Sequence, residues 1–141
     1  MQAETVFNRL CFLEGEWIGK SQDGAEVVDK LVCTLEHGKL TCISELLSQG
    51  GERLERKIEF WIEDDKLRGT WTDHGANKQE YLCEYDSESD EFLFNLTEMA
   101  TSLDYKTIRR LNNFSFITME QSAIQGTSSV RSFEMSYRRT L

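Results

Sequence analysis

From Gly15 to the end of the chain, apolar and polar residues alternate in short runs, and turn-forming residues bound each run. A period of two residues is typical of β-strands, and clusters such as His37-Gly38, Asp64-Asp65 and Asn112-Asn113 favour tight turns between strands. No later segment has a helical period long enough for a parallel crossover, so neighbouring strands should pair antiparallel. The predicted strands cover residues 16–22, 26–36, 39–48, 53–63, 66–73, 79–86, 91–98, 103–112, 114–121 and 129–139.

An open sheet of ten strands would expose both edges, and so large a twisted sheet tends to curl. Closing the sheet into a barrel removes the edges. We therefore predict an all-β fold, in which residues 1–141 form one domain with a ten-stranded antiparallel up-and-down β-barrel. Such a ring is wider than an eight-stranded barrel that its own side chains fill, so we expect an internal cavity.

The first residues follow a different pattern. Residues 3–13 carry apolar side chains at steps of three or four, which predicts one short amphipathic helix. Gly15 follows and can end that helix. Trp17 begins the first strand, and we expect its ring to fill the end of the barrel under the helix. Gly19 leaves room for another segment to approach closely.

The stretch FLEGEWIGKSQ, from Phe12 to Gln22, follows the helix, and the all-strand chain ends in FEMSYRRTL. With these features the sequence resembles the calycin superfamily, which includes lipocalins, fatty-acid-binding proteins and nitrobindin-like domains. Gly-x-Trp on the first strand is that superfamily's usual mark, and an aromatic-plus-Arg ending is common in it. No helical lid is predicted between the first two strands, and in this respect the chain is more similar to lipocalin-like or nitrobindin-like domains. The resemblance implies a barrel that carries a ligand inside.

Charge and hydropathy exclude several classes of partner. The net charge is −9, from 25 acidic and 16 basic residues, whereas nucleic-acid binding draws on clustered Lys and Arg. No apolar run approaches the ~20 residues that span a bilayer, and the N-terminus lacks a signal-peptide pattern. We therefore expect a cytoplasmic protein with no nucleic-acid partner and no membrane span.

The four cysteines, Cys11, Cys33, Cys42 and Cys83, show no metal-binding spacing, so buried free thiols are expected. Cys33 and Cys42 flank the turn at 37–38. They would face each other in one register only, which is the register that permits a disulfide.

Motifs for catalysis and cofactors give little support to an enzyme. The chain has no GxSxG, HExxH, P-loop or dinucleotide motif. The nitrobindin resemblance raises the question of haem bound through a late histidine, but no histidine follows His74, and no cofactor is expected. Two alternatives stay open: a chromophore-handling, bilin lyase-like enzyme with Glu120 as its acid/base, and a packed barrel that serves as a protein-interaction module.

Strand 53–63 has the clearest inner face. Its apolar row contains one charged residue, Arg56. A two-residue turn at 64–65 would pair Ile62 with Leu67 and Ile58 with Trp71, which continues the same face. The same two-residue alternation in the later strands assigns further side chains to the inner face of the barrel. The candidate ligand-binding residues are Arg56, Phe60, Trp71, Tyr105, Arg109, Phe116, Glu120, Phe133, Tyr137 and Arg139.

A buried arginine is unfavourable without a partner. Three arrangements stay open at this point. One is an internal network that pairs Glu120 with Arg109 or Arg139, and Arg56 with Glu45. Another is an anchor for a ligand carboxylate. In the third, a bulge turns these side chains to solvent. We expect a small binding protein that holds an apolar, fatty-acid-like ligand in the barrel interior, with a carboxylate as the candidate polar group.

Overall fold

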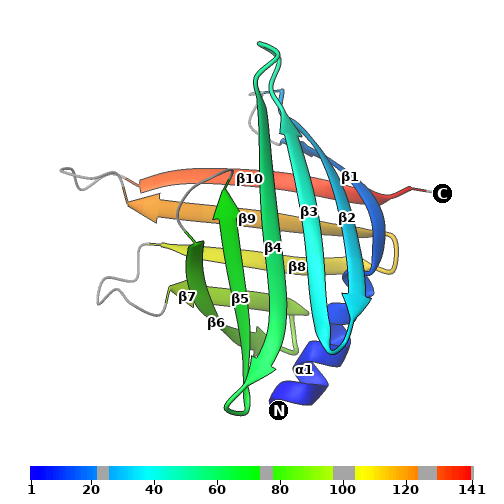
Figure 1. The fold of residues 1–141 in the computed structure, drawn as a ribbon, viewed down its shortest axis with the longest axis vertical. Helices are drawn as coiled ribbons and strands as arrows, with labels where there is room; N and C mark the ends of the chain where they lie inside the picture. The colour runs from blue at the N-terminus through cyan, green and yellow to red at the C-terminus, as the bar shows by residue number, and fades with distance from the viewer. Residues whose placement is uncertain (22–25, 74–77, 97–103, 124–129, 141) are drawn as a thin grey trace.

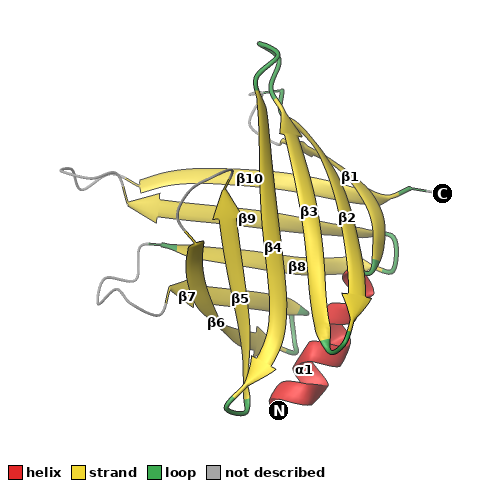
Figure 2. Cartoon of the chain, viewed as in Figure 1, coloured by secondary structure: helices red, strands yellow, loops and turns green. Residues whose placement is uncertain are grey.

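The computed structural model describes residues 1–21, 26–73, 78–96, 104–123 and 130–140. Within these ranges ten antiparallel strands form a closed barrel, and one short α-helix precedes them (Figures 1 and 2). The predicted all-β barrel is confirmed. Four predicted strands extend to residues outside the described ranges (22, 97–98, 103 and 129). His74 also lies outside these ranges. Among the described residues, no helix combines the length and apolar character needed to cross a membrane.

Each strand pairs with its neighbours in sequence, and β1 closes the ring against β10. The strands are β1 (Gly15–Ser21), β2 (Val28–Glu36), β3 (Lys39–Leu47), β4 (Arg53–Glu63), β5 (Lys66–Asp73), β6 (Lys78–Asp86), β7 (Glu91–Leu96), β8 (Tyr105–Asn112), β9 (Ser115–Ala123) and β10 (Val130–Arg139).

Tight turns set the register of the sheet. In the β2–β3 hairpin, His37 and Gly38 both have positive φ, at 53° and 74°, as a type I′ turn requires. The resulting register places Cys33 opposite Cys42, and both buried thiols are free. The turn at 64–65 likewise yields the expected partners across β4 and β5, Ile62 with Leu67 and Ile58 with Trp71.

A helical segment covers one end of the barrel (Figure 1). It consists of α1 (Ala3–Leu10) and a short 3-10 helix, η1 (Cys11–Leu13). The apolar residues of α1 that are buried against the barrel are Val6, Phe7 and Leu10. The expected amphipathic helix over 3–13 is therefore present, and its last three residues form a 3-10 helix.

Trp17 fills the barrel end under this segment and has no exposed surface. Its indole N–H donates to the backbone carbonyl of Leu13 at 2.8 Å. Its ring packs edge to face on Phe12 and Phe116. The expected position of Trp17 is confirmed.

Arg139 holds the closed end together. Its guanidinium lies 4.1 Å from the centre of the Trp17 ring. Its three nitrogens donate to backbone carbonyls: Nη2 to Phe12 at 2.7 Å, Nη1 to Glu14 at 2.7 Å and Nε to Asn113 at 3.1 Å. Arg139 therefore joins the end of the helical segment to the β8–β9 turn, and it does not line the barrel cavity described below.

The glycines that flank Trp17 make space for these contacts. Gly15 has φ of +127°, and a Cβ there would lie 2.5 Å from Nη1 of Arg139. A Cβ on Gly19 would lie 2.5 Å from a ring carbon of Tyr137. The segment that approaches Gly19 closely, as expected, is therefore β10, through the ring of Tyr137.

We predict that Arg139→Met lowers the free energy of unfolding by about 2–4 kcal/mol, because hydrogen bonds from a charged group to carbonyls and a cation–π contact are lost. Urea unfolding followed by tryptophan fluorescence measures the change. The matched control is Arg138→Met, at an exposed position on the same strand, which should stay within about 0.5 kcal/mol. Equal effects of the two substitutions would contradict the structural role of Arg139.

Candidate functional site

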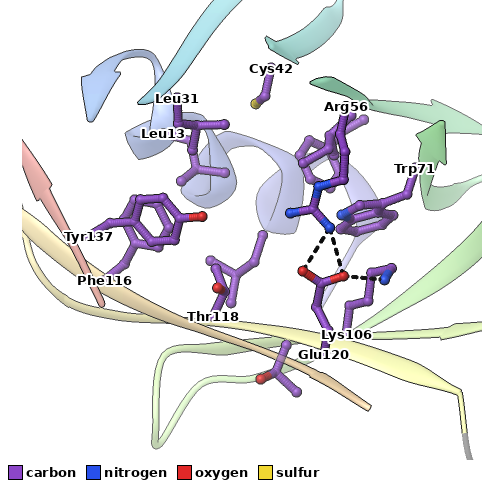
Figure 3. Close-up of a pocket in the computed structure, with 14 residues that line it drawn as sticks. Leu13, Leu31, Cys42, Arg56, Trp71, Lys106, Phe116, Thr118, Glu120 and Tyr137 are labelled. Atoms are coloured by element: carbon purple, nitrogen blue, oxygen red, sulfur yellow. Dashed lines mark hydrogen bonds and ion pairs between the residues drawn. The ribbon is translucent and has the colours of Figure 1, made fainter. Parts of the chain in front are cut away.

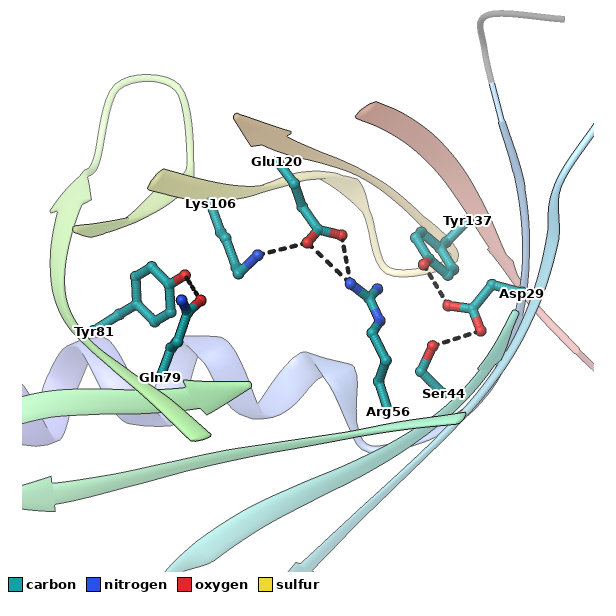
Figure 4. A network of polar contacts seen from close by, with 8 residues as sticks. All are labelled: Asp29, Ser44, Arg56, Gln79, Tyr81, Lys106, Glu120 and Tyr137. Atoms are coloured by element: carbon teal, nitrogen blue, oxygen red, sulfur yellow. Dashed lines mark hydrogen bonds and ion pairs between the residues drawn. The ribbon is translucent and has the colours of Figure 1, made fainter. Parts of the chain in front are cut away.

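A layer of polar side chains crosses the barrel toward the end opposite α1 (Figure 4). Several of them stand near the strand ends at that side: Asp29, Gln79 and Lys106 are each the second residue of their strand. The layer consists of Asp29, Ser44, Arg56, Gln79, Tyr81, Lys106, Glu120 and Tyr137. Polar groups in an interior need partners, and two sets of contacts supply most of them.

The first set is an ion pair that spans the lumen. In the ring of described strands, β4 and β9 lie five positions apart in either direction, so they face each other. Nη1 of Arg56, on β4, donates to both carboxylate oxygens of Glu120, on β9, at 2.9 Å. Nζ of Lys106, on β8, donates to Oε1 of the same carboxylate at 2.6 Å. The Arg56 and Glu120 side chains are only 10% and 18% exposed.

These contacts fix the charges of the pair. Burial disfavours the ionised form of Glu120, but the charges and hydrogen bonds of Arg56 and Lys106 outweigh burial and lower its pKa to about 2. Burial also lowers the pKa of Arg56, and the neighbouring Glu120 carboxylate more than offsets this, so the net direction is upward. The pair is therefore fully charged at neutral pH.

The second set centres on Asp29, which has no exposed surface. Its carboxylate accepts hydrogen bonds from the Ser44 hydroxyl at 2.8 Å and the Tyr137 hydroxyl at 2.5 Å. Burial, and then the nearby Asp29 carboxylate, raise the pKa of Tyr137 well above its ordinary value. The phenol stays protonated and serves as a donor, while its ring stacks on Phe116 at 4.6 Å.

A cavity of about 40 Å³ lies beside the polar layer (Figure 3). This volume holds about two or three water molecules. Arg56, Lys106 and Glu120 form part of its wall. Its apolar wall includes Leu13, Leu31, Ile58, Phe60, Trp71 and Phe116.

Arg56 uses only part of its hydrogen-bonding capacity. Among the described residues, Nη1 has partners, whereas Nε is buried without one. Nε and Nη2 form the side-on edge of a guanidinium, with two parallel N–H donors. In Figure 3 this edge points away from Glu120 and into the cavity. An unpaired buried donor that faces an apolar cavity is the feature of this site that best fits a ligand.

The structure brings some of the candidate residues together and separates others. Arg56, Phe60, Trp71, Phe116, Glu120 and Tyr137 all line the cavity. Phe133 packs against the core nearer the open end, beside Leu46 and Leu54. Tyr105 does not line the cavity, and Arg109 is exposed. The expectation that Arg109 points inward is therefore wrong.

The error at Arg109 has a local cause. Tyr105–Asn112 carries charged residues in both alternating rows, so its pattern does not reveal an inner face. Lys106 and Ile108 stand opposite Glu120 and Thr118, which line the cavity, so they belong to the inner row. Sequence reasoning missed Lys106. The available signal was Ile108, the one strongly apolar residue in the middle of that strand. Asp29 was also missed, although it begins the inner row that continues through Leu31.

The internal network is present, but with other partners than expected. Arg56 binds Glu120, whereas Glu45 pairs with Arg53 at 2.6 Å. The register explains the difference: Arg56 stands opposite Ser44 and Glu45 opposite Glu55, so the side chains of Arg56 and Glu45 point to opposite faces of the sheet.

Comparison with known proteins supports the fold. No protein-family model matches the chain, and no curated protein matches its sequence. Its structure is similar to that of EF1p2_mFAP2b bound to the small-molecule dye DFHBI, with a TM-score of 0.55 and 9% identity over 96% of this chain and 99% of the other. At this identity the likeness shows a shared barrel fold.

We predict that Glu120 contributes stability that acid removes. Its folded pKa of about 2 lies below its ordinary 4.5, so the contribution is complete above about pH 5 and is lost as the pH falls toward 2. Over that interval the wild type should lose on the order of 3 kcal/mol more than Glu120→Gln.

Urea unfolding of both proteins at several pH values between 7 and 2 measures this difference. Glu36→Gln, at an exposed position, is the control and should differ from the wild type by a constant amount. A gap between the wild type and Glu120→Gln that does not change with pH would show that the ion pair is absent.

Proposed function

We propose that the protein binds a small molecule with an apolar body inside the barrel, and that Arg56 holds its polar group. The observation that carries this proposal is the buried, unpartnered Nε of Arg56 beside an apolar cavity. Leaving a buried donor unpaired costs about 1–3 kcal/mol. A ligand that brings an acceptor to this edge would recover part of that cost and would bury its apolar surface as well.

The size of the cavity favours a compact ligand. Pockets that bury drug-sized ligands typically hold ~300–1,000 Å³, far above the cavity of about 40 Å³ here. A fatty-acid-like chain would require a large rearrangement of the interior. Lys106 is the lining side chain best suited to move for a smaller ligand, because it is long and unbranched. Its ammonium lies 5.4 Å and 5.5 Å from the ring centres of Trp71 and Tyr81.

We also propose that the ligand enters at the end opposite α1, because Trp17 and the helical segment close the other end. Membership of the calycin superfamily is part of the same proposal. The contact between Trp17 and Arg139 supports it, since it joins the Gly-x-Trp stretch of the first strand to the aromatic-plus-Arg ending of the last.

The structure gives no support to the alternative in which Glu120 acts as a catalytic acid in a bilin lyase-like enzyme. Two cations hold this carboxylate with a pKa of about 2, whereas an efficient general acid at neutral pH has a pKa near 7. A binding role therefore fits the charges of the site better.

We predict that a panel of small aromatic amides, lactams, ketones and carboxylates contains compounds that raise the thermal midpoint of the wild type by about 2 °C or more at saturating concentration. The double variant Arg56→Met/Glu120→Gln removes both charges of the ion pair and should lose the shift, because the donors for the ligand are gone.

The matched control is Arg53→Met. Arg53 lies on the same strand as Arg56, is exposed and forms an ion pair with Glu45. This variant should keep the shift. A panel without any binder, or equal shifts for the wild type and the double variant, would refute the proposal.

A further inference from the structure

We infer that the polar group held by Arg56 is a neutral planar acceptor, such as an amide or lactam carbonyl, and that Glu120 makes the site reject carboxylates. This inference rests on the proposed function and specifies its ligand. It replaces the carboxylate expected from the sequence, for reasons of charge.

The charges of the polar layer already balance. The Glu120 carboxylate lies 2.9 Å from Nη1 of Arg56 and 2.6 Å from Nζ of Lys106. The Asp29 carboxylate belongs to the same layer (Figure 4). Two formal positive charges thus face two formal negative charges. Arg56 offers free hydrogen-bond donors, but its positive charge is already compensated.

The chain as a whole carries a net charge of −9. A ligand carboxylate in the layer would be a third negative charge beside two positive ones, in a region of low dielectric where like charges repel strongly.

A neutral acceptor fits the free edge better. A carbonyl oxygen has two lone pairs, so it can accept from both Nε and Nη2 of Arg56. This contact satisfies the buried Nε and adds no charge to the interior. A carboxylate would make the same hydrogen bonds, but it would also bury an uncompensated charge, which is far more costly than burying a paired polar group.

The test uses phenylacetamide and phenylacetate, which share one shape and differ in charge. Isothermal titration calorimetry at pH 7 should show that the wild type binds phenylacetamide at least about tenfold more tightly. In Glu120→Gln, Arg56 keeps its charge without its carboxylate partner. That variant should therefore lose the preference, because it binds phenylacetate at least about tenfold more tightly than the wild type does.

Glu36→Gln serves as the control for the change in net charge, because Glu36 is exposed and is the last residue of β2. It should keep the wild-type preference. The comparison of the two compounds on the wild type decides the question even if Glu120→Gln does not fold.

Three results would overturn the inference. Equal or tighter binding of phenylacetate by the wild type would contradict the charge argument and leave the proposed function standing. An unchanged preference in a folded Glu120→Gln would show that Glu120 does not set it. If neither compound binds the wild type and the wider panel also contains no binder, the proposed function fails and this inference fails with it.

Discussion

The ion pair between Arg56 and Glu120 crosses the barrel between strands that face each other, and the interior is organised around it. A charged arginine in such a place is tolerated only when it is paired. The pair, joined by Lys106, belongs to a polar layer near one end, and Phe12, Trp17 and Phe116 pack against one another at the end beside α1. The cavity lies where these two regions meet, so it combines apolar walls with charged groups whose net charge is close to zero.

Two arginines show how the use of hydrogen-bond donors separates a structural role from a binding role. All three nitrogens of Arg139 donate to backbone carbonyls, and its guanidinium covers Trp17. Its capacity is used within the fold, so it holds the closed end together. In Arg56, by contrast, only Nη1 is paired among the described residues, and a buried Nε remains. The unused capacity points to a partner outside the chain.

The strands and the ring were predictable because alternation and tight turns are local signals, and ring closure follows from the number of antiparallel neighbours. Arg56 was predictable because it is the one charge in an apolar row. Its partner was not, since Glu120 lies 64 residues away and meets Arg56 only across the closed lumen. Arg109 was expected inside and Lys106 was missed, because Tyr105–Asn112 has charges in both rows.

A double-mutant cycle at pH 7 tests the ion pair across the lumen most directly. Urea unfolding would give the free energies of the wild type, Arg56→Met, Glu120→Gln and the variant with both substitutions. Direct contact between the two buried charges predicts a coupling energy of at least about 2 kcal/mol, with the double variant more stable than the sum of the single losses implies. Losses that add within about 0.5 kcal/mol would mean that the two side chains do not meet inside the barrel.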